Sequence, residues 1–174
     1  MTRSRNNIFA GIALMSALAM IFSYVEALLP FSIGIPGVKL GIANIVIIIA
    51  IFIFDWKIAF AVNTIRIILS GLLFSGVFGI IYSMAGGILS LAVMALLKKT
   101  NTFSIIGVGA AAGVAHNLGQ IVTAALIIKN LQMFLYFPVL IFSGIITGII
   151  TGTVAYILLK KLPASISGEF GKRM

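Results

Sequence analysis

The sequence contains no cysteine and only three acidic residues in 174. The absence of cysteine excludes disulfides, thiolate metal sites and cysteine-based catalysis. Charged residues make up 9% of the chain, whereas a typical soluble domain has roughly 25%. Because a soluble fold needs a polar surface that this composition cannot supply, we expect the protein surface to face lipid.

Long apolar runs dominate the chain instead. Hydrophobic residues make up 61% of it, and the mean hydropathy is +1.25. Since about 20 apolar residues span a bilayer, the sequence predicts an all-α, polytopic membrane protein, with residues 1–174 forming one bundle of six transmembrane helices. The expected helices cover residues 8–29, 38–54, 58–74, 77–97, 103–128 and 133–159.

The basic residues predict the orientation of this bundle. If the N-terminus is cytoplasmic, Lys129 alone lies in an external loop. Nine basic residues then lie on the cytoplasmic side: Arg3, Arg5, Lys57, Lys98, Lys99, Lys160, Lys161, Lys172 and Arg173. This asymmetry follows the positive-inside rule and favours an even number of helices, so both termini are expected in the cytoplasm of a bacterial-type cell membrane. Topology thus explains the net charge of +9, and we expect no nucleic-acid partner.

Several polar residues lie inside or at the edge of the expected helices, where an ionisable group costs about 2.5–3.5 kcal/mol. The candidate binding residues are Glu26, Lys39, Asn44, Arg66, His116, Asn117 and Gln120. Asn63 and Arg66 share one helix face, as do His116 and Gln120, because residues three or four apart are neighbours on a helix. A polar cavity open to the exterior would gather the whole set.

The balance of charge in this set predicts the kind of ligand. The set contains the basic residues Lys39 and Arg66, with His116 as a third basic group, and its one acidic residue is Glu26. This favours a carboxylate or phosphate, which arginine binds in bidentate fashion. The N-terminus of the helix that follows the loop would add its positive dipole end near Lys39.

Each of these residues also has a purely structural explanation. Arg66 can pair with Glu26, and Lys39 can extend to the outer headgroups. Asn44, His116 and Asn117 can hydrogen-bond between helices.

The sequence lacks the motifs of several kinds of chemistry. It has no phosphate-binding loop of the GxxxxGK[ST] type, so we expect no ATP hydrolysis by this chain. Three scattered acids cannot hold Mg²⁺ on a diphosphate, and one histidine without cysteine argues against zinc. We therefore expect no enzyme activity, catalytic residue, metal or cofactor.

Small residues at four-residue spacing predict close helix packing. They occur in three helices: Ala13 and Ala17; Gly109 and Gly113; and Gly144, Gly148 and Gly152. Packing inside one bundle explains the two glycine stripes. A small homo-oligomeric channel that uses the Gly144–Gly152 stripe as its interface is an alternative.

Three stretches of the chain carry a family resemblance. They are Gly34-Ile-Pro-Gly-Val-Lys-Leu-Gly-Ile-Ala-Asn44, then Arg66-Ile-Ile-Leu-Ser-Gly-Leu-Leu-Phe74 with Tyr82-Ser-Met-Ala-Gly-Gly-Ile-Leu-Ser90, and Gly113-Val-Ala-His-Asn-Leu-Gly-Gln120. Over about residues 8–160 the chain resembles the Gx transporter family, which is also described as heptaprenyl diphosphate synthase component I. That family is similar to the substrate-binding S-components of energy-coupling factor (ECF) transporters.

The resemblance implies a six-helix protein that binds a vitamin-like ligand near its outer face, with the Phe31–Gly37 loop as a lid. It also implies a transmembrane T subunit, contacted by Ala13 and Ala17, and two cytoplasmic ATPases. The expected function is uptake of a small, anionic, vitamin- or quinone/isoprenoid-related compound. The alternative is a non-catalytic membrane accessory subunit of heptaprenyl diphosphate synthase.

Overall fold

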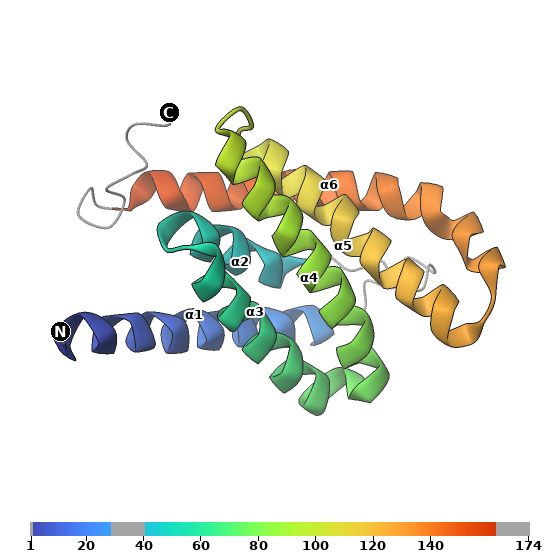
Figure 1. Cartoon of the computed structure of the whole chain (residues 1–174), viewed down its shortest axis with the longest axis horizontal. Helices are drawn as coiled ribbons and strands as arrows, with labels where there is room; N and C mark the ends of the chain where they lie inside the picture. Colours follow the sequence, from blue (N-terminus) through green and yellow to red (C-terminus); the bar gives the residue numbers. More distant parts are fainter. Residues whose placement is uncertain (1, 29–40, 163–174) are drawn as a thin grey trace.

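The computed structural model describes residues 2–28 and 41–162, and every element in these two ranges is helical. There are six α-helices in them: α1 (Thr2–Leu28), α2 (Ile42–Ile53), α3 (Trp56–Ser70), α4 (Gly76–Thr100), α5 (Ile105–Ile128) and α6 (Phe137–Lys161). A π-helical turn, Gly71–Ser75, joins α3 to α4, and a 3-10 turn, Leu131–Tyr136, precedes α6 (Figure 1). The all-α prediction is confirmed.

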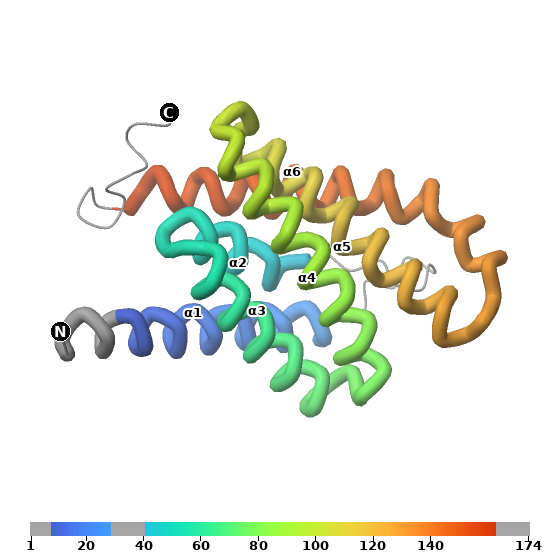
Figure 2. Tube along the Cα trace, viewed as in Figure 1, coloured from blue at the N-terminus to red at the C-terminus, as the bar shows by residue number. Residues whose placement is uncertain are grey.

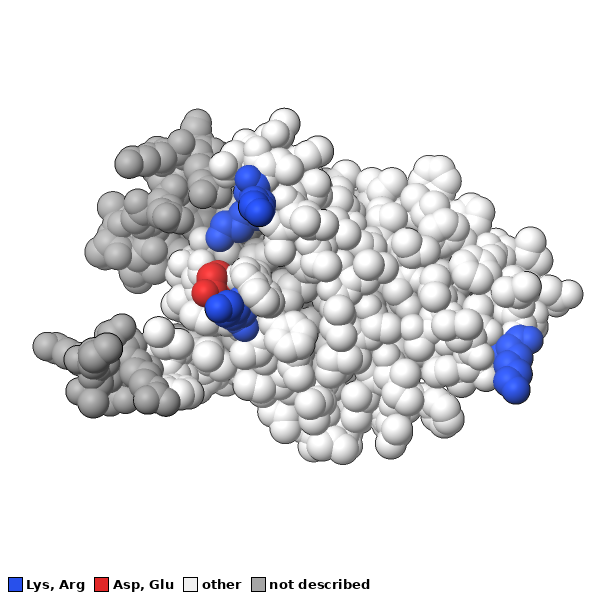
Figure 3. All heavy atoms as spheres, in the orientation of Figure 1, with Lys and Arg blue, Asp and Glu red and all other residues white. Residues whose placement is uncertain are grey.

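The described surface is that of a membrane protein. Four helical stretches are long and apolar enough to cross a bilayer: Ile8–Leu28, Trp56–Thr100, Ile105–Ile128 and Leu131–Lys161. On the face drawn in Figure 3, the charged side chains lie toward the two ends of the long axis, with a broad uncharged surface between them. Large apolar side chains such as Leu14, Leu72 and Leu126 are about seven-tenths exposed, which is stable against lipid tails.

The expected helix boundaries differ from the observed ones where polar groups set the ends. The first helical residue of α5 is Ile105 and not Phe103, because the hydroxyl of Ser104 accepts a hydrogen bond from the Gly107 N–H. Similarly, the carboxylate of Asp55 accepts from the Ile58 N–H, so α3 begins at Trp56, two residues before the expected start. Helix boundaries that are predicted from hydropathy miss such caps, because hydropathy records only how apolar the side chains are.

The chain reverses direction between α3 and α4, as Figure 2 shows. Gly76 has a φ of 70°, which a residue with a side chain rarely adopts. A tight turn at Ser75 and Gly76 therefore divides the 45-residue apolar stretch Trp56–Thr100 into two helices.

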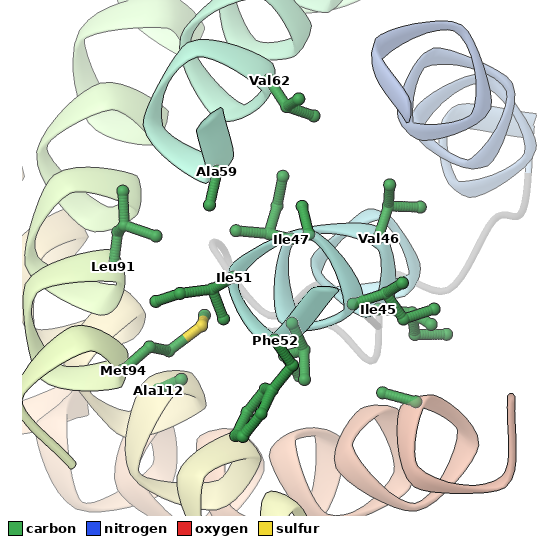
Figure 4. Close-up of a cluster of buried hydrophobic side chains, with 14 of the residues drawn as sticks. Ile45, Val46, Ile47, Ile51, Phe52, Ala59, Val62, Leu91, Met94 and Ala112 are labelled. Carbon is green, nitrogen blue, oxygen red and sulfur yellow. The ribbon is translucent and has the colours of Figure 1, made fainter. Parts of the chain in front are cut away.

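Helix α2 is short and surrounded by the other helices. All eight residues from Ile45 to Phe52 are buried, and Figure 4 shows Ile47 and Ile51 lying among side chains of α3 and α4. A helix that is apolar on every side belongs in the interior of a bundle. At 1.5 Å per residue its 12 residues rise about 18 Å, so α2 is too short to cross a hydrocarbon core of about 30 Å by itself.

The C-terminal end of α2 is held by a lysine from α4. The Lys98 Nζ donates a hydrogen bond to the Ile51 carbonyl oxygen at 2.5 Å and lies 5.5 Å from the centre of the Phe52 ring. A cation is favourable at this end, where helical carbonyl groups lack partners. The N-terminal end of α2 therefore lies inside the bundle, about 18 Å along the helix axis from the C-terminal end that Lys98 contacts.

Helices α5 and α6 pack backbone to backbone through glycine. A Cβ atom built on Gly109 would lie 2.6 Å from the Gly148 carbonyl oxygen and 2.8 Å from the Gly152 Cα. Gly113 and Gly144 meet in the same way. The glycine stripe of α6 is thus covered by α5 of the same chain, which leaves no glycine surface there for the homo-oligomeric channel.

Candidate functional site

The N-terminus of α2 is bound by a carboxylate from α1. The Gly41 N–H donates a hydrogen bond to the Glu26 Oε1 at 2.6 Å. Gly41 precedes the first helical residue and has a φ of 68°, a left-handed conformation that favours glycine. The first turn of α2 presents the positive end of its dipole here, so a carboxylate is favourable at this position.

Arg66 of α3 reaches the same end of α2. Its Nη2 donates to the Asn63 Oδ1 at 2.6 Å and makes a longer contact of 3.5 Å with the Asn44 Oδ1. Only 9% of the Arg66 side chain is exposed, and its Nε is buried without a hydrogen-bond partner. A guanidinium has five N–H donors, so this buried cation retains the capacity to bind another acceptor.

Glu26 and Arg66 also interact electrostatically. Opposite charges attract more strongly in the interior of a bundle than in water, because the dielectric constant is lower there. Glu26, Asn44 and Arg66, from three different helices, therefore form one polar cluster in the described structure. We call these three residues with Gly41 and Asn63 the α2 cluster.

His116 and Gln120 of α5 lie on the other side of a glycine pair in α4. A Cβ atom on Gly87 would lie 2.6 Å from the Asn63 Nδ2, in the α2 cluster. A Cβ atom on the adjacent Gly86 would lie 3.2 Å from the His116 Cε1 and 2.9 Å from the Gln120 Cγ. The two glycines thus allow polar side chains of α3 and α5 to approach the same part of α4.

Asn117 is directed at α6. Its Nδ2 donates to the Leu140 carbonyl oxygen at 2.7 Å and to the Ser143 Oγ at 3.3 Å. The period of a helix places consecutive residues about 100° apart, so Asn117 occupies a different face of α5 from its neighbour His116. Its role in ligand binding stays a prediction, and its observed contacts are those of helix packing.

Replacement of Asn117 by alanine should lower the free energy of unfolding in detergent by about 1 kcal/mol, a typical value for a hydrogen bond between membrane helices. Thr153→Ala is the matched control, since the Thr153 hydroxyl donates only to the Ile149 carbonyl of its own helix in the described contacts. Unchanged stability of Asn117→Ala together with lost ligand binding would contradict a packing role.

Three further predictions concern Lys39, the Phe31–Gly37 loop and the alanines of α1. Lys39 and the loop lie outside the described residues. Ala13 and Ala17 are exposed on α1, whereas Ser16 and Ala19 of the same helix are buried. The alanine face is therefore uncovered by the described part of the chain.

Two members of the α2 cluster, Asn63 and Gly41, are not among the candidate binding residues predicted from the sequence. Asn63 shares a helix face with Arg66, and that three-residue spacing is the signal for their hydrogen bond. Gly41 binds Glu26 through its backbone N–H, a contact that side-chain chemistry cannot indicate. Among the described residues no group of three or more His, Cys, Asp or Glu side chains could hold a metal ion.

The geometry of the α2 cluster suits recognition of a small polar group. A helix that begins inside a bundle directs its first N–H groups into the interior. In membrane transporters, helix N-termini in such positions bind anionic substrate groups. Arg66 adds a delocalised charge that matches a carboxylate or phosphate. The described residues thus bring a carboxylate, an amide and a guanidinium together within the apolar bundle.

Comparisons with known proteins give one match. Residues 15–158 match the family model described as heptaprenyl diphosphate synthase component I. No curated protein and no solved structure matches the chain. The family match extends from the middle of α1 into the last turn of α6 and includes every residue of the α2 cluster.

Proposed function

The chain belongs to the heptaprenyl diphosphate synthase component I family, and from this premise we propose that it is a non-catalytic membrane subunit that binds a small molecule through an anionic group. The binding site is the α2 cluster, with Arg66 as its main anion-binding residue. His116 and Gln120 contribute from across the α4 glycine pair, and Lys39 contributes from outside the described residues.

The observation that carries this proposal is the buried state of Arg66. An arginine with nine-tenths of its side chain buried must compensate the cost of leaving water. Its hydrogen bonds to Asn63 and Asn44 occupy Nη2 alone, and Nε has no partner. A structural contact would be expected to satisfy more of the guanidinium, whereas a binding residue retains donors for its ligand.

We propose uptake as the function of this binding. The family resembles the S-components of ECF transporters, which work with a T subunit and two cytoplasmic ATPases. The exposed Ala13 and Ala17 face would contact the T subunit, since small side chains let two membrane helices approach closely. The chain would lie in the cell membrane with both termini and most of its lysines in the cytoplasm.

The substrate class follows from the site and from the family description. A quinone-related or isoprenoid-related acid, or a vitamin with an acidic group, has both an apolar body for the bundle and an anionic group for Arg66. The chain itself would carry out no chemistry on such a compound, because its three acidic residues are too few to hold Mg²⁺ against a diphosphate.

A second candidate function rests on the words of the family description. Component I of a heptaprenyl diphosphate synthase implies an enzyme subunit as partner. In that case the chain would be a membrane accessory subunit, and an aspartate-rich soluble partner would supply the catalytic residues. The α2 cluster would then bind a related compound or serve to hold α1, α2 and α3 together.

Co-purification from the native membrane in mild detergent separates these two functions. The uptake proposal predicts recovery with a T subunit and two ATPases, and it predicts that Ala13→Leu with Ala17→Leu abolishes this recovery. The matched control is Leu14→Ala, on the same helix. Recovery of a soluble prenyl synthase subunit, insensitive to the alanine substitutions, would contradict uptake and support the accessory role.

A further inference from the structure

The α2 cluster contains an internal anion, and this restricts what it can bind. Glu26 lies at the helix N-terminus, which is the position that most favours negative charge. Arg66 and Glu26 carry charges of opposite sign, so these two ionised groups of the described cluster cancel. A ligand that brings only negative charge would leave an uncompensated charge inside an apolar bundle, which is costly.

The two ionised groups are held by different partners. Glu26 Oε1 accepts from the Gly41 N–H, while Arg66 Nη2 donates to Asn63 and Asn44. A carboxylate has about four lone-pair sites, so Glu26 retains acceptor capacity beyond its contact with Gly41. The side chain of Glu26 is also only partly buried, which leaves it accessible to a ligand.

We propose that Glu26 is a specificity-determining residue that selects a ligand with a protonated amine beside its anionic group. Arg66 binds the carboxylate or phosphate through Nε, and Glu26 binds the amine. A ligand with one amine and one singly charged anionic group is itself neutral, so the charges of the ligand, Arg66 and Glu26 sum to zero. Bare polyanions such as a diphosphate are disfavoured, because Glu26 repels them and Arg66 is the one cation of the described cluster. This inference rests on the proposed anion site at Arg66 and adds a second recognition element to it.

Two phosphate monoesters that differ only by an amine provide the test. O-Phosphoethanolamine carries a protonated amine two carbons from its phosphate, and ethyl phosphate lacks the amine. Binding of each is measured by isothermal titration calorimetry with the purified full chain in detergent, for the wild type, Glu26→Gln and Arg66→Gln. Glutamine has nearly the same shape as glutamate, and circular dichroism verifies that each variant remains folded.

The wild type should bind phosphoethanolamine about tenfold more tightly than ethyl phosphate, since a charged hydrogen bond contributes roughly that much. Glu26→Gln should remove most of this preference, chiefly by improving the binding of ethyl phosphate. Equal affinities in the wild type, or a preference that Glu26→Gln leaves intact, would overturn the role of Glu26. Affinities that do not change in Arg66→Gln, or no binding of either ester to the wild type, would instead contradict the anion site itself.

Discussion

Replacement of Gly109 by alanine should destabilise the folded protein by about 2–3 kcal/mol, the usual cost of forcing a methyl group into a closely packed contact. The new Cβ would lie 2.6 Å from the Gly148 carbonyl oxygen, 2.8 Å from the Gly152 Cα and 3.1 Å from the Gly152 nitrogen. All three atoms belong to the backbone of α6, so no side-chain rotation can relieve the contact. Helices α5 and α6 would have to separate along the glycine stripe.

Gly107 provides the matched control, two residues earlier in the same helix. A Cβ there would lie 3.5 Å from the Ser104 Oγ and 3.9 Å from the Phe103 Cδ1, which are ordinary van der Waals distances. Alanine also favours the helical state over glycine by up to about 1 kcal/mol, so Gly107→Ala should be neutral or stabilising. Unfolding by a titration of denaturing detergent, followed by circular dichroism, measures both variants. Equal stabilities would contradict the glycine-mediated packing of α5 on α6.

The second large effect is expected at Arg66. Arg66→Gln should lower the affinity for the native ligand at least about 100-fold, because a charge-assisted pair of hydrogen bonds is replaced by a single neutral donor. Glutamine is a good helix former and can hydrogen-bond to an asparagine three residues away on the same helix, so the fold should survive the change. The native ligand can be observed as a small molecule retained by the gently purified protein in native mass spectrometry.

Lys57→Gln is the control for this experiment. It also removes one positive charge, but Lys57 is exposed at the start of α3, about 14 Å along the helix axis from Arg66. The wild type and Lys57→Gln should retain the same small molecule, and Arg66→Gln should lose it. If Arg66→Gln retains the molecule in full, Arg66 serves only to hold α3 against its neighbours.

The sequence is a good guide to those features that depend on composition and helical period. Apolar runs predict the all-α membrane fold, and glycines at four-residue spacing in α5 and α6 predict a close helix contact, which the structure contains. The pairing of Asn63 with Arg66 follows from their three-residue spacing. In each case the signal is local, because residues three or four apart share a face in any α-helix.

Features that depend on how helices are rotated and where they begin are harder to predict. The apolar run from Val38 to Phe54 resembles one spanning helix, yet α2 begins only at Ile42, after a left-handed Gly41. Asn117 is adjacent to His116 in the sequence but hydrogen-bonds to α6. The pattern of polar residues on α5 does not reveal which neighbour each face meets, because that depends on the packing of the whole bundle.

The structure also gives a role to the glycine pair of α4. From the sequence, plain packing and close approach of a ligand are both compatible with Gly86 and Gly87. In the structure these residues separate the Asn63 side chain of α3 from the His116 and Gln120 side chains of α5. A larger residue at either position would displace these polar side chains, so the pair allows α3 and α5 to pack closely on α4.

An experimental structure of the purified protein with its retained small molecule would show whether Arg66 binds that molecule. The proposed site predicts an acidic oxygen of the molecule at about 2.8 Å from the Arg66 Nε, the distance of a charge-assisted hydrogen bond. It also predicts that the molecule lies beside the N-terminus of α2, between α1, α2 and α3. An Arg66 Nε bonded to an oxygen of the protein, with the small molecule bound elsewhere, would contradict it.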